Sequence, residues 1–282
     1  MNPTDIRLVV NADDFGMSAA ISRGVLCAHR DGIVTSTSLL GNCDDMHSAC
    51  ALLAEAPDLG VGVHLSLVGG RPVAAAHAVR TLTDAHGAFL PRAQDLLLPL
   101  VRGRVDGAEI ELEFEAQIAR VRDAGIVPDH LNTHRHLGFV PAVGRALEAV
   151  ARRLGIAGVR SAVERPTLAW LTDPRRGLEA GILSGFAWLT RRQMGTLRHG
   201  PQSWGFVESG RLDEIRILEI IGRLGPGAHE LICHPGEEDD AGTAAREPEH
   251  YRSQELRALA SPKVRRALER RGVQLCRWKD LF

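Results

Sequence analysis

Several polar side chains directly follow apolar runs, an arrangement from which a hydrolytic site can be built. Two adjacent carboxylates, Asp13 and Asp14, follow the run LVV at residues 8–10. His64 ends a second apolar stretch, and His234 ends a third just before a Pro-Gly turn, which would display the imidazole at a bend. Carboxylates and imidazoles bind divalent metals and transfer protons, so these residue types favour metal-assisted hydrolysis. The alternative for either aspartate is to cap the helix expected to begin near Ser18.

The densest group of polar residues is the segment DHLNTHRH at residues 129–136. Alternate residues of a strand share a face, so His130, Asn132, His134 and His136 could line one wall of a site. At most two of these histidines can be metal ligands. The others are then available to orient a ligand or to contact substrate.

An aspartate with two histidines is a usual ligand set for a divalent ion that keeps positions open for water and substrate. Such an ion lowers the pKa of its bound water to about 7 and polarises the carbonyl under attack. A nearby carboxylate then takes the proton of the water and a histidine protonates the leaving amine, two roles that fit Asp13 and His234. We expect one divalent ion, Zn²⁺ or Mg²⁺: two imidazoles favour zinc, whereas a carboxylate with several waters tolerates magnesium.

The elements that must position these residues alternate along the chain. Short apolar runs predict strands at residues 7–10, 33–40, 59–65, 130–132, 158–160, 230–233 and 273–275. Amphipathic periodicity predicts helices at residues 19–31, 44–56, 108–124, 141–154, 212–223 and 253–270. The polar groups fall at the carboxyl ends of predicted strands, where barrel enzymes carry their catalytic residues.

This order of elements predicts an α/β fold, a distorted (β/α) barrel of about seven parallel strands. A doubly wound nucleotide-binding sheet is disfavoured because no glycine-rich phosphate loop follows the first strand. We expect residues 1–282 to form a single domain, with a helical insertion at about 165–200.

Composition narrows the possible partners. A formal net charge of −1 over 282 residues argues against nucleic acid, and an aromatic content of 4% argues against a stacking groove for long sugar chains. Five cysteines without CxxC spacing indicate a reducing compartment. With no leader-like segment and no apolar run of 18 residues, we expect a cytoplasmic protein; a homodimer is compatible with the sequence but not required by it.

Taken in order along the chain, four motifs resemble those of the YdjC-like carbohydrate deacetylases. They are NADDFG at residues 11–16, GVHL at 62–65, NTHRH at 132–136 and CHPG at 233–236. The resemblance runs from Val9 to about Gly236 and implies a deacetylase-type (β/α) barrel. It further implies that Asp14, His64 and His134 bind the metal, that Asp13 is the general base and that His234 is the general acid.

The segments VGGRP at 68–72 and AGVR at 157–160 look most like the branch of this family associated with hopanoid biosynthesis. That branch implies an N-acetylglucosaminyl lipid as substrate, whereas the other well-known family activity is deacetylation of short chitooligosaccharides. We predict His136, Arg71 and Arg160 as substrate contacts.

Two positions depart from the family pattern. Asn132 replaces a common aspartate, so the group expected to orient His134 would be a neutral amide. Gly138 replaces a further histidine that often follows the two histidines of the NTHRH motif, which puts a substrate contact at that position in doubt.

Other interpretations remain open at the level of sequence. One is metal-assisted cleavage or isomerisation of a sugar or phosphoester in the same barrel. Another is a non-catalytic sugar-binding barrel, which would not need Asp13 and His234 in proton transfer. The apolar and then basic segment 181–198, with Trp188, would either contact a lipid or membrane surface peripherally or pack as an outer helix on the barrel.

Overall fold

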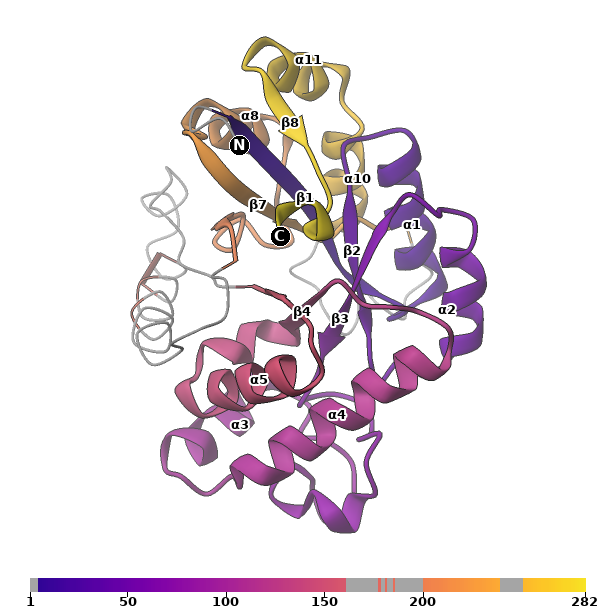
Figure 1. Ribbon diagram of the computed structural model, residues 1–282, viewed down its shortest axis with the longest axis vertical. Helices are drawn as coiled ribbons and strands as arrows, with labels where there is room; N and C mark the ends of the chain where they lie inside the picture. The colour runs from indigo at the N-terminus through magenta and orange to yellow at the C-terminus, as the bar shows by residue number, and fades with distance from the viewer. Residues whose placement is uncertain (1–4, 161–176, 179–180, 182–184, 186–199, 239–250) are drawn as a thin grey trace.

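A computed structural model describes residues 5–160, 177, 178, 181, 185, 200–238 and 251–282. Its centre is a curled, parallel sheet surrounded by helices (Figure 1). Most of the expected insertion at 165–200, including Trp188, lies outside the described residues. No helix in the described part is both long and apolar enough to cross a membrane.

The sheet has the strand order β5-β4-β3-β2-β1-β7-β6, with β8 paired to the start of β1. Every pairing between these strands is parallel. The bounds are β1 Ile6–Phe15, β2 Ser36–Leu40, β3 Gly60–Leu65, β4 His130–Thr133, β5 Gly158–Val159, β6 Gln202–Trp204, β7 Gly227–Cys233 and β8 Val273–Leu275. Since β5 and β6 are the two ends of the order, the sheet is a half-barrel. The prediction of a distorted α/β barrel is confirmed.

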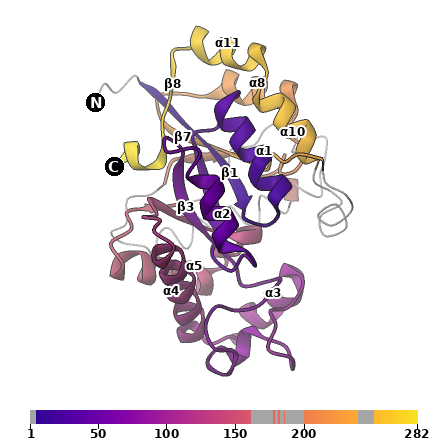
Figure 2. The same cartoon turned by 90° about the vertical axis from the view of Figure 1, so that its right-hand side faces the viewer.

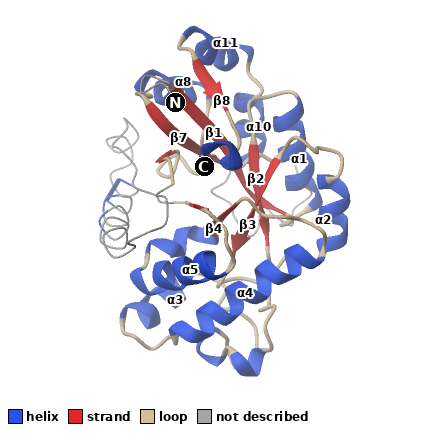
Figure 3. Cartoon of the chain, in the orientation of Figure 1, coloured by secondary structure: helices blue, strands red, loops and turns tan. Residues whose placement is uncertain are grey.

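Helices cover the outside of the strands (Figure 3), and Figure 2 shows α1 and α2 side by side over one outer face. The α-helices are α1 Ala19–Arg30, α2 Met46–Leu53, α3 Ala93–Val101, α4 Gly107–Asp123, α5 Pro141–Arg153, α8 Glu214–Arg223, α10 Arg252–Leu259 and α11 Pro262–Arg270. Short 3-10 helices lie at η1 Ala76–Ala78, η2 Arg80–Leu82, η3 His134–Phe139 and η4 Trp278–Leu281. Ser18 caps α1 by accepting a hydrogen bond from the backbone N–H of Ile21, so neither Asp13 nor Asp14 is needed for that task.

The single helix predicted over 253–270 is wrong, because the structure has two helices there. Ser261 accepts a hydrogen bond from the backbone N–H of Lys263 and starts a new helix, with Pro262 in its first turn. Proline lacks the N–H that would continue α10, and its fixed φ suits a first helical position. The prediction also missed α3, which contains Pro99, and the three-residue strand β6.

Strand β1 runs five residues beyond its predicted end at Val10 and reaches Phe15. From Leu8 onward all its residues are buried, as expected for a parallel strand covered on both faces. Its pairing with β2 is irregular between Ala12 and Phe15, and Asp14 has a left-handed φ of 69°. This irregular end brings both aspartates to the carboxyl edge of the sheet.

The opposite, amino edge of the sheet is sealed by the C-terminal segment. Trp278 is fully buried and packs with Val9 and Leu281 in a small apolar cluster. Its indole also stacks on the imidazole of His130, with ring centroids 4.8 Å apart. The carboxyl edge of the sheet is thus irregular and polar, whereas the amino edge is covered by a small cluster centred on Trp278.

Candidate metal centre and active site

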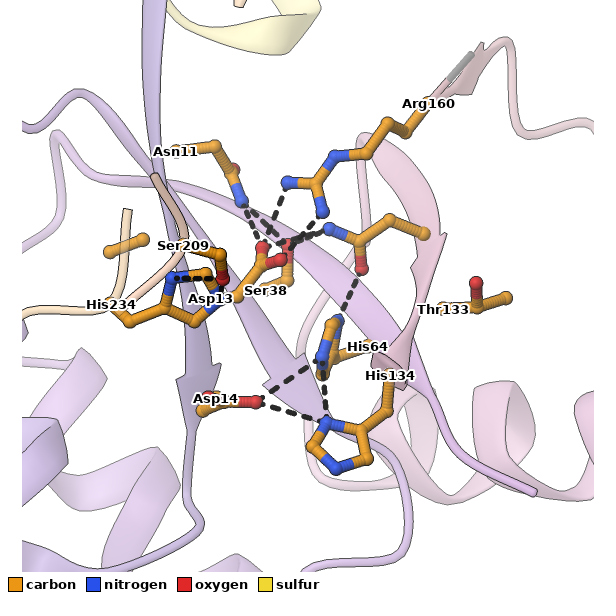
Figure 4. A network of polar contacts seen from close by, with 12 residues as sticks. Asn11, Asp13, Asp14, Ser38, His64, Thr133, His134, Arg160, Ser209 and His234 are labelled. Atoms are coloured by element: carbon orange, nitrogen blue, oxygen red, sulfur yellow. Dashed lines mark hydrogen bonds and ion pairs between the residues drawn. The ribbon is translucent and has the colours of Figure 1, made fainter. Parts of the chain in front are cut away.

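Three side chains from three strand ends converge on one point (Figure 4). Asp14 Oδ1 lies 3.1 Å from His134 Nδ1 and 3.3 Å from His64 Nε2. The two histidine nitrogens lie 3.2 Å from each other. Among the described residues this is the single group of three or more His, Cys, Asp or Glu side chains placed to hold a metal ion.

The spacing of these ligand atoms fits a divalent ion. With metal–ligand bonds of about 2.1 Å, neighbouring ligand atoms lie about 3.0 Å apart in an octahedral site and about 3.4 Å apart in a tetrahedral one. The observed edges of 3.1, 3.2 and 3.3 Å fall between these values. Around such an ion the three atoms would occupy one face of the coordination sphere and would leave the other positions for water and substrate.

Backbone geometry aims these ligands. The parallel register places His64 of β3 beside Leu40 on one side and Asn132 on the other. His134 begins η3 directly after β4. Among the described residues, the non-glycine residues with left-handed φ are Asp14, Arg135 and His136. Such backbone strain accumulates at functional sites, where the surrounding fold enforces it.

Asn132 orients His64, and the prediction that its amide would orient His134 is wrong. Asn132 Oδ1 accepts a hydrogen bond from His64 Nδ1 at 2.7 Å, which leaves the lone pair of Nε2 facing Asp14. The amide nitrogen of Asn132 donates to Asp13 Oδ1 at 3.0 Å and to Ser38 Oγ at 2.7 Å. Asn132 therefore holds His64, its partner on the adjacent strand β3, and not His134 of its own sequence motif.

Asp13 is a buried carboxylate clamped by Arg160. The guanidinium donates from Nη1 to Asp13 Oδ2 at 2.6 Å and from Nη2 to Asp13 Oδ1 at 2.8 Å. Burial alone would raise the pKa of Asp13, but Arg160, with His64 and His234, holds that pKa well below its usual range. Arg160 Nε also donates to Glu230 at 2.9 Å. Asp13 is thus kept ionised beside the metal ligands.

His234 follows β7, and the pairing of Ala12 with Cys233 brings it to the end of β1. It is buried, with its backbone N–H donated to Glu255 Oε2 at 2.6 Å. Ser209 Oγ lies 3.3 Å from its Nδ1. The ring is near enough to Asp13 to help lower the pKa of that carboxyl, and Figure 4 shows the two side chains together.

His136 lies among aromatic rings near the site. It stacks on Phe139 with centroids 5.5 Å apart and meets Phe206 edge-on at 4.6 Å. Its Nδ1 is buried without a hydrogen-bond partner among the described residues. Burial, then the charge of Arg160, lowers the pKa of His136 well below its usual value, so the ring is neutral.

The other two predicted substrate contacts, Arg71 and Arg160, lie in surroundings different from those of His136. Arg71 is exposed in the loop after β3 and lines a surface hollow with Asn42 and Arg120. Arg160 is engaged by Asp13 and Glu230, as described above. His130 is fully buried below the site, where its Nδ1 lies 2.6 Å from Asp129 and its Nε2 3.0 Å from Ser38 Oγ.

Sequence reasoning missed four residues that support the site. Asn11 donates to Asp13 and to Ser38, and Arg252 donates from Nη2 to Asp14 Oδ2 at 2.7 Å. Glu255 accepts a hydrogen bond from the backbone N–H of His234. The four missed residues are thus Asn11, Ser38, Arg252 and Glu255. Asn11 and Ser38 adjoin the motifs and could have been found from strand alternation. Arg252 and Glu255 carry no local signal, since Arg252 is 238 residues from the aspartate that it contacts.

A parallel half-barrel with an Asp-His-His group at its carboxyl edge defines a class of α/β proteins in which that group could hold a metal ion. The chain belongs to the YdjC-like protein family, whose sequence model matches residues 7–270. It is 31% identical over 277 residues to a carbohydrate deacetylase of Geobacillus stearothermophilus, covering 97% of both chains. It is 30% identical over 277 residues to a chitooligosaccharide deacetylase of Yersinia pestis, covering 97% of this chain and 98% of the relative.

Among solved structures, a protein of Enterococcus faecalis described as a cellobiose-phosphate cleavage protein superposes with a TM-score of 0.77. The two chains are 24% identical, and the match covers 99% of each. This similarity shows that the fold is shared over its whole length.

Proposed function

We propose that this protein is a metal-dependent deacetylase that hydrolyses the N-acetyl group of an amino sugar and releases acetate. The observation that carries the proposal is the position of the ionised Asp13 and of His234 beside the triangle of ligand atoms from Asp14, His64 and His134. The names of the relatives, carbohydrate deacetylase and chitooligosaccharide deacetylase, support a carbohydrate substrate.

A divalent ion bound by the three ligands would supply a water of lowered pKa and polarise the acetyl carbonyl. Two imidazoles in the set favour Zn²⁺ over Mg²⁺. Asp14 and His134 meet through Oδ1 and Nδ1, and His64 presents Nε2, the atom left free by its bond to Asn132. The ligand residues thus enter the reaction already oriented.

Asp13 is the general base in this proposal. Its Oδ1 accepts hydrogen bonds from Asn11, Asn132 and Arg160, whereas among the described residues its Oδ2 accepts only from Arg160. Oδ2 therefore has a lone pair left to orient a water molecule and take its proton. The low pKa of the carboxyl keeps this oxygen unprotonated before each turnover.

His234 is the general acid and protonates the leaving amine, a task for which imidazole is suited near neutral pH. His136 is a substrate contact in this proposal, because its neutral, half-buried ring lies beside Phe139 and Phe206 near the site. Arg71 and Arg160 are the other predicted substrate contacts. Arg160 would act from its place on Asp13, while Arg71 would meet only an extended substrate that reaches the exposed loop.

The substrate is an N-acetylglucosamine unit in a short oligosaccharide or in a glycolipid of the hopanoid type. The name of the Yersinia relative favours the oligosaccharide. A peripheral membrane contact and a homodimer stay predictions from the sequence, as does the single domain over residues 1–282.

Acetate release from di-N-acetylchitobiose and from an N-acetylglucosaminyl lipid tests the proposal, using protein stripped of metal and then reconstituted with Zn²⁺ or Mg²⁺. We expect metal-dependent acetate from at least one substrate, lost in Asp13→Asn and His134→Ala and kept in His77→Ala, a histidine exposed on η1. If neither substrate yields acetate with either metal, the proposal is wrong.

A further inference from the structure

Arg252, the first residue of α10, forms an ion pair with a proposed metal ligand. Its Nη2 lies 2.7 Å from Asp14 Oδ2. Only 7% of the Arg252 side chain and 2% of the Asp14 side chain are exposed. An ion pair so removed from water is not screened by solvent, so its geometry is well defined and its loss matters.

The two oxygens of Asp14 have separate partners. Oδ2 accepts from Arg252, while Oδ1 faces His134 Nδ1 and His64 Nε2. A hydrogen bond at one oxygen fixes the plane of the carboxylate and leaves the other as a single ligand atom. Residues that hydrogen-bond to a metal ligand without binding the metal themselves influence the affinity and geometry of metal sites.

Arg252 is itself held by the turn that follows His234. Its backbone carbonyl accepts from the N–H of Gly236 at 3.2 Å, and its Nη1 donates to the carbonyl of His234 at 3.5 Å. A Cβ placed on Gly236 would lie 3.1 Å from Arg252 Cβ and 3.2 Å from its Cδ. The stem of the arginine therefore packs directly against backbone that only glycine leaves bare.

We propose that Arg252 is a positioning residue of the metal site. It holds Asp14 as a one-oxygen ligand and ties the orientation of that ligand to the turn carrying His234. The inference rests on the proposed metal-dependent function and adds a residue that no motif contains.

A positioning role and direct repulsion of the bound cation predict opposite results. A guanidinium near a bound cation repels it, so if that repulsion were its only effect, removing Arg252 would strengthen metal binding. If Arg252 orients Asp14, removing it weakens metal binding despite the lost repulsion.

The test measures affinity for Co²⁺ and Zn²⁺ by competition with a fluorescent chelator, together with the visible absorption of bound Co²⁺. We expect Arg252→Gln to weaken binding by about 10–100-fold and to change the Co²⁺ spectrum, with Arg252→Lys in between. Gly236→Ala keeps the guanidinium but displaces its stem, so it should weaken binding in the same direction by a smaller factor. Arg271→Gln is the matched control, because Arg271 donates to the carbonyls of Gly222 and Leu224 just before β7, at the opposite edge of the sheet.

Thermal unfolding checks that each variant is folded. If Arg252→Gln does not fold, the metal affinities of Arg252→Lys and Gly236→Ala decide the question. Unchanged or tighter metal binding in the folded Arg252 variants would overturn the positioning role. Failure of the unmodified protein to bind either ion would instead overturn the proposed function, so the two failures are distinguishable.

Discussion

The two edges of the sheet are stabilised in different ways. At the carboxyl edge, buried carboxylates are paired with arginines, Asp13 with Arg160 and Asp14 with Arg252, and the backbone is strained at Asp14. At the amino edge, Trp278 packs with Val9 in an apolar cluster. A strained polar site at one edge of the sheet is thus accompanied by close apolar packing at the other edge.

The largest effect should follow removal of a metal ligand. We expect His134→Ala to abolish metal-dependent acetate release. The free energy of unfolding of the metal-free protein should fall only modestly, because Asp14 keeps its ion pair with Arg252. Isothermal titration with Zn²⁺ and chemical denaturation measure the two quantities. A fully active His134→Ala variant would show that His134 at the carboxyl edge is not needed to hold a catalytic metal.

Arg160→Gln should come next, because it leaves two buried carboxylates, Asp13 and Glu230, without their cation. Breaking a buried ion pair from one side costs about 3–5 kcal/mol of stability. Urea denaturation of the metal-free protein measures this cost. Adding Asp13→Asn to Arg160→Gln should restore part of the stability without restoring activity, and no restoration would show that the pair is not the source of the loss.

Trp278→Ala tests the apolar edge. Truncating a fully buried tryptophan costs about 3–5 kcal/mol, here without touching a proposed ligand. We expect a lower midpoint of urea unfolding with Zn²⁺ affinity kept in the folded fraction. A loss of metal affinity as large as that of a ligand variant would mean that the two edges are not independent.

The smallest effect is expected at Asn132, which hydrogen-bonds to the proposed metal ligand His64 at the carboxyl edge. Asn132→Ala removes the acceptor for His64 Nδ1 and should weaken Zn²⁺ binding by about 10–100-fold. Asn132→Asp keeps an acceptor at that position and should bind Zn²⁺ more tightly than Asn132→Ala. Equal affinities of the two variants would show that the hydrogen bond does not orient the ligand.

Much of this organisation could be predicted from sequence because it is local. Apolar runs marked most of the strands, and the aspartates and histidines stand at the strand ends. Where the pattern was weak the prediction failed: β6 contains one large apolar residue, Trp204, and the polar residues at the end of β1 concealed its extension to Phe15.

The arginine partners of the two aspartates lie beyond what local patterns can reveal. Arg160 was predicted to contact substrate, and its pairing with Asp13 spans 147 residues. Arg252 belongs to no motif, and only the folded chain brings it to Asp14. Charge pairs of this kind are set by topology, which a single sequence does not display.

The pairing of β1 has a consequence for the order of events during synthesis. Residues Ile6 to Leu8 of β1 pair with β7 and β8, at Gly227–His229 and Val273–Leu275. At about 5–20 residues per second, a ribosome needs on the order of 10–40 s to make the roughly 220 residues that separate β1 from β7. Over that interval Ile6 to Leu8 lack both strands with which they pair in the folded sheet, so the start of β1 stays unpaired. Of the described strands, β1 precedes the others along the chain and is nevertheless among the last to be completed.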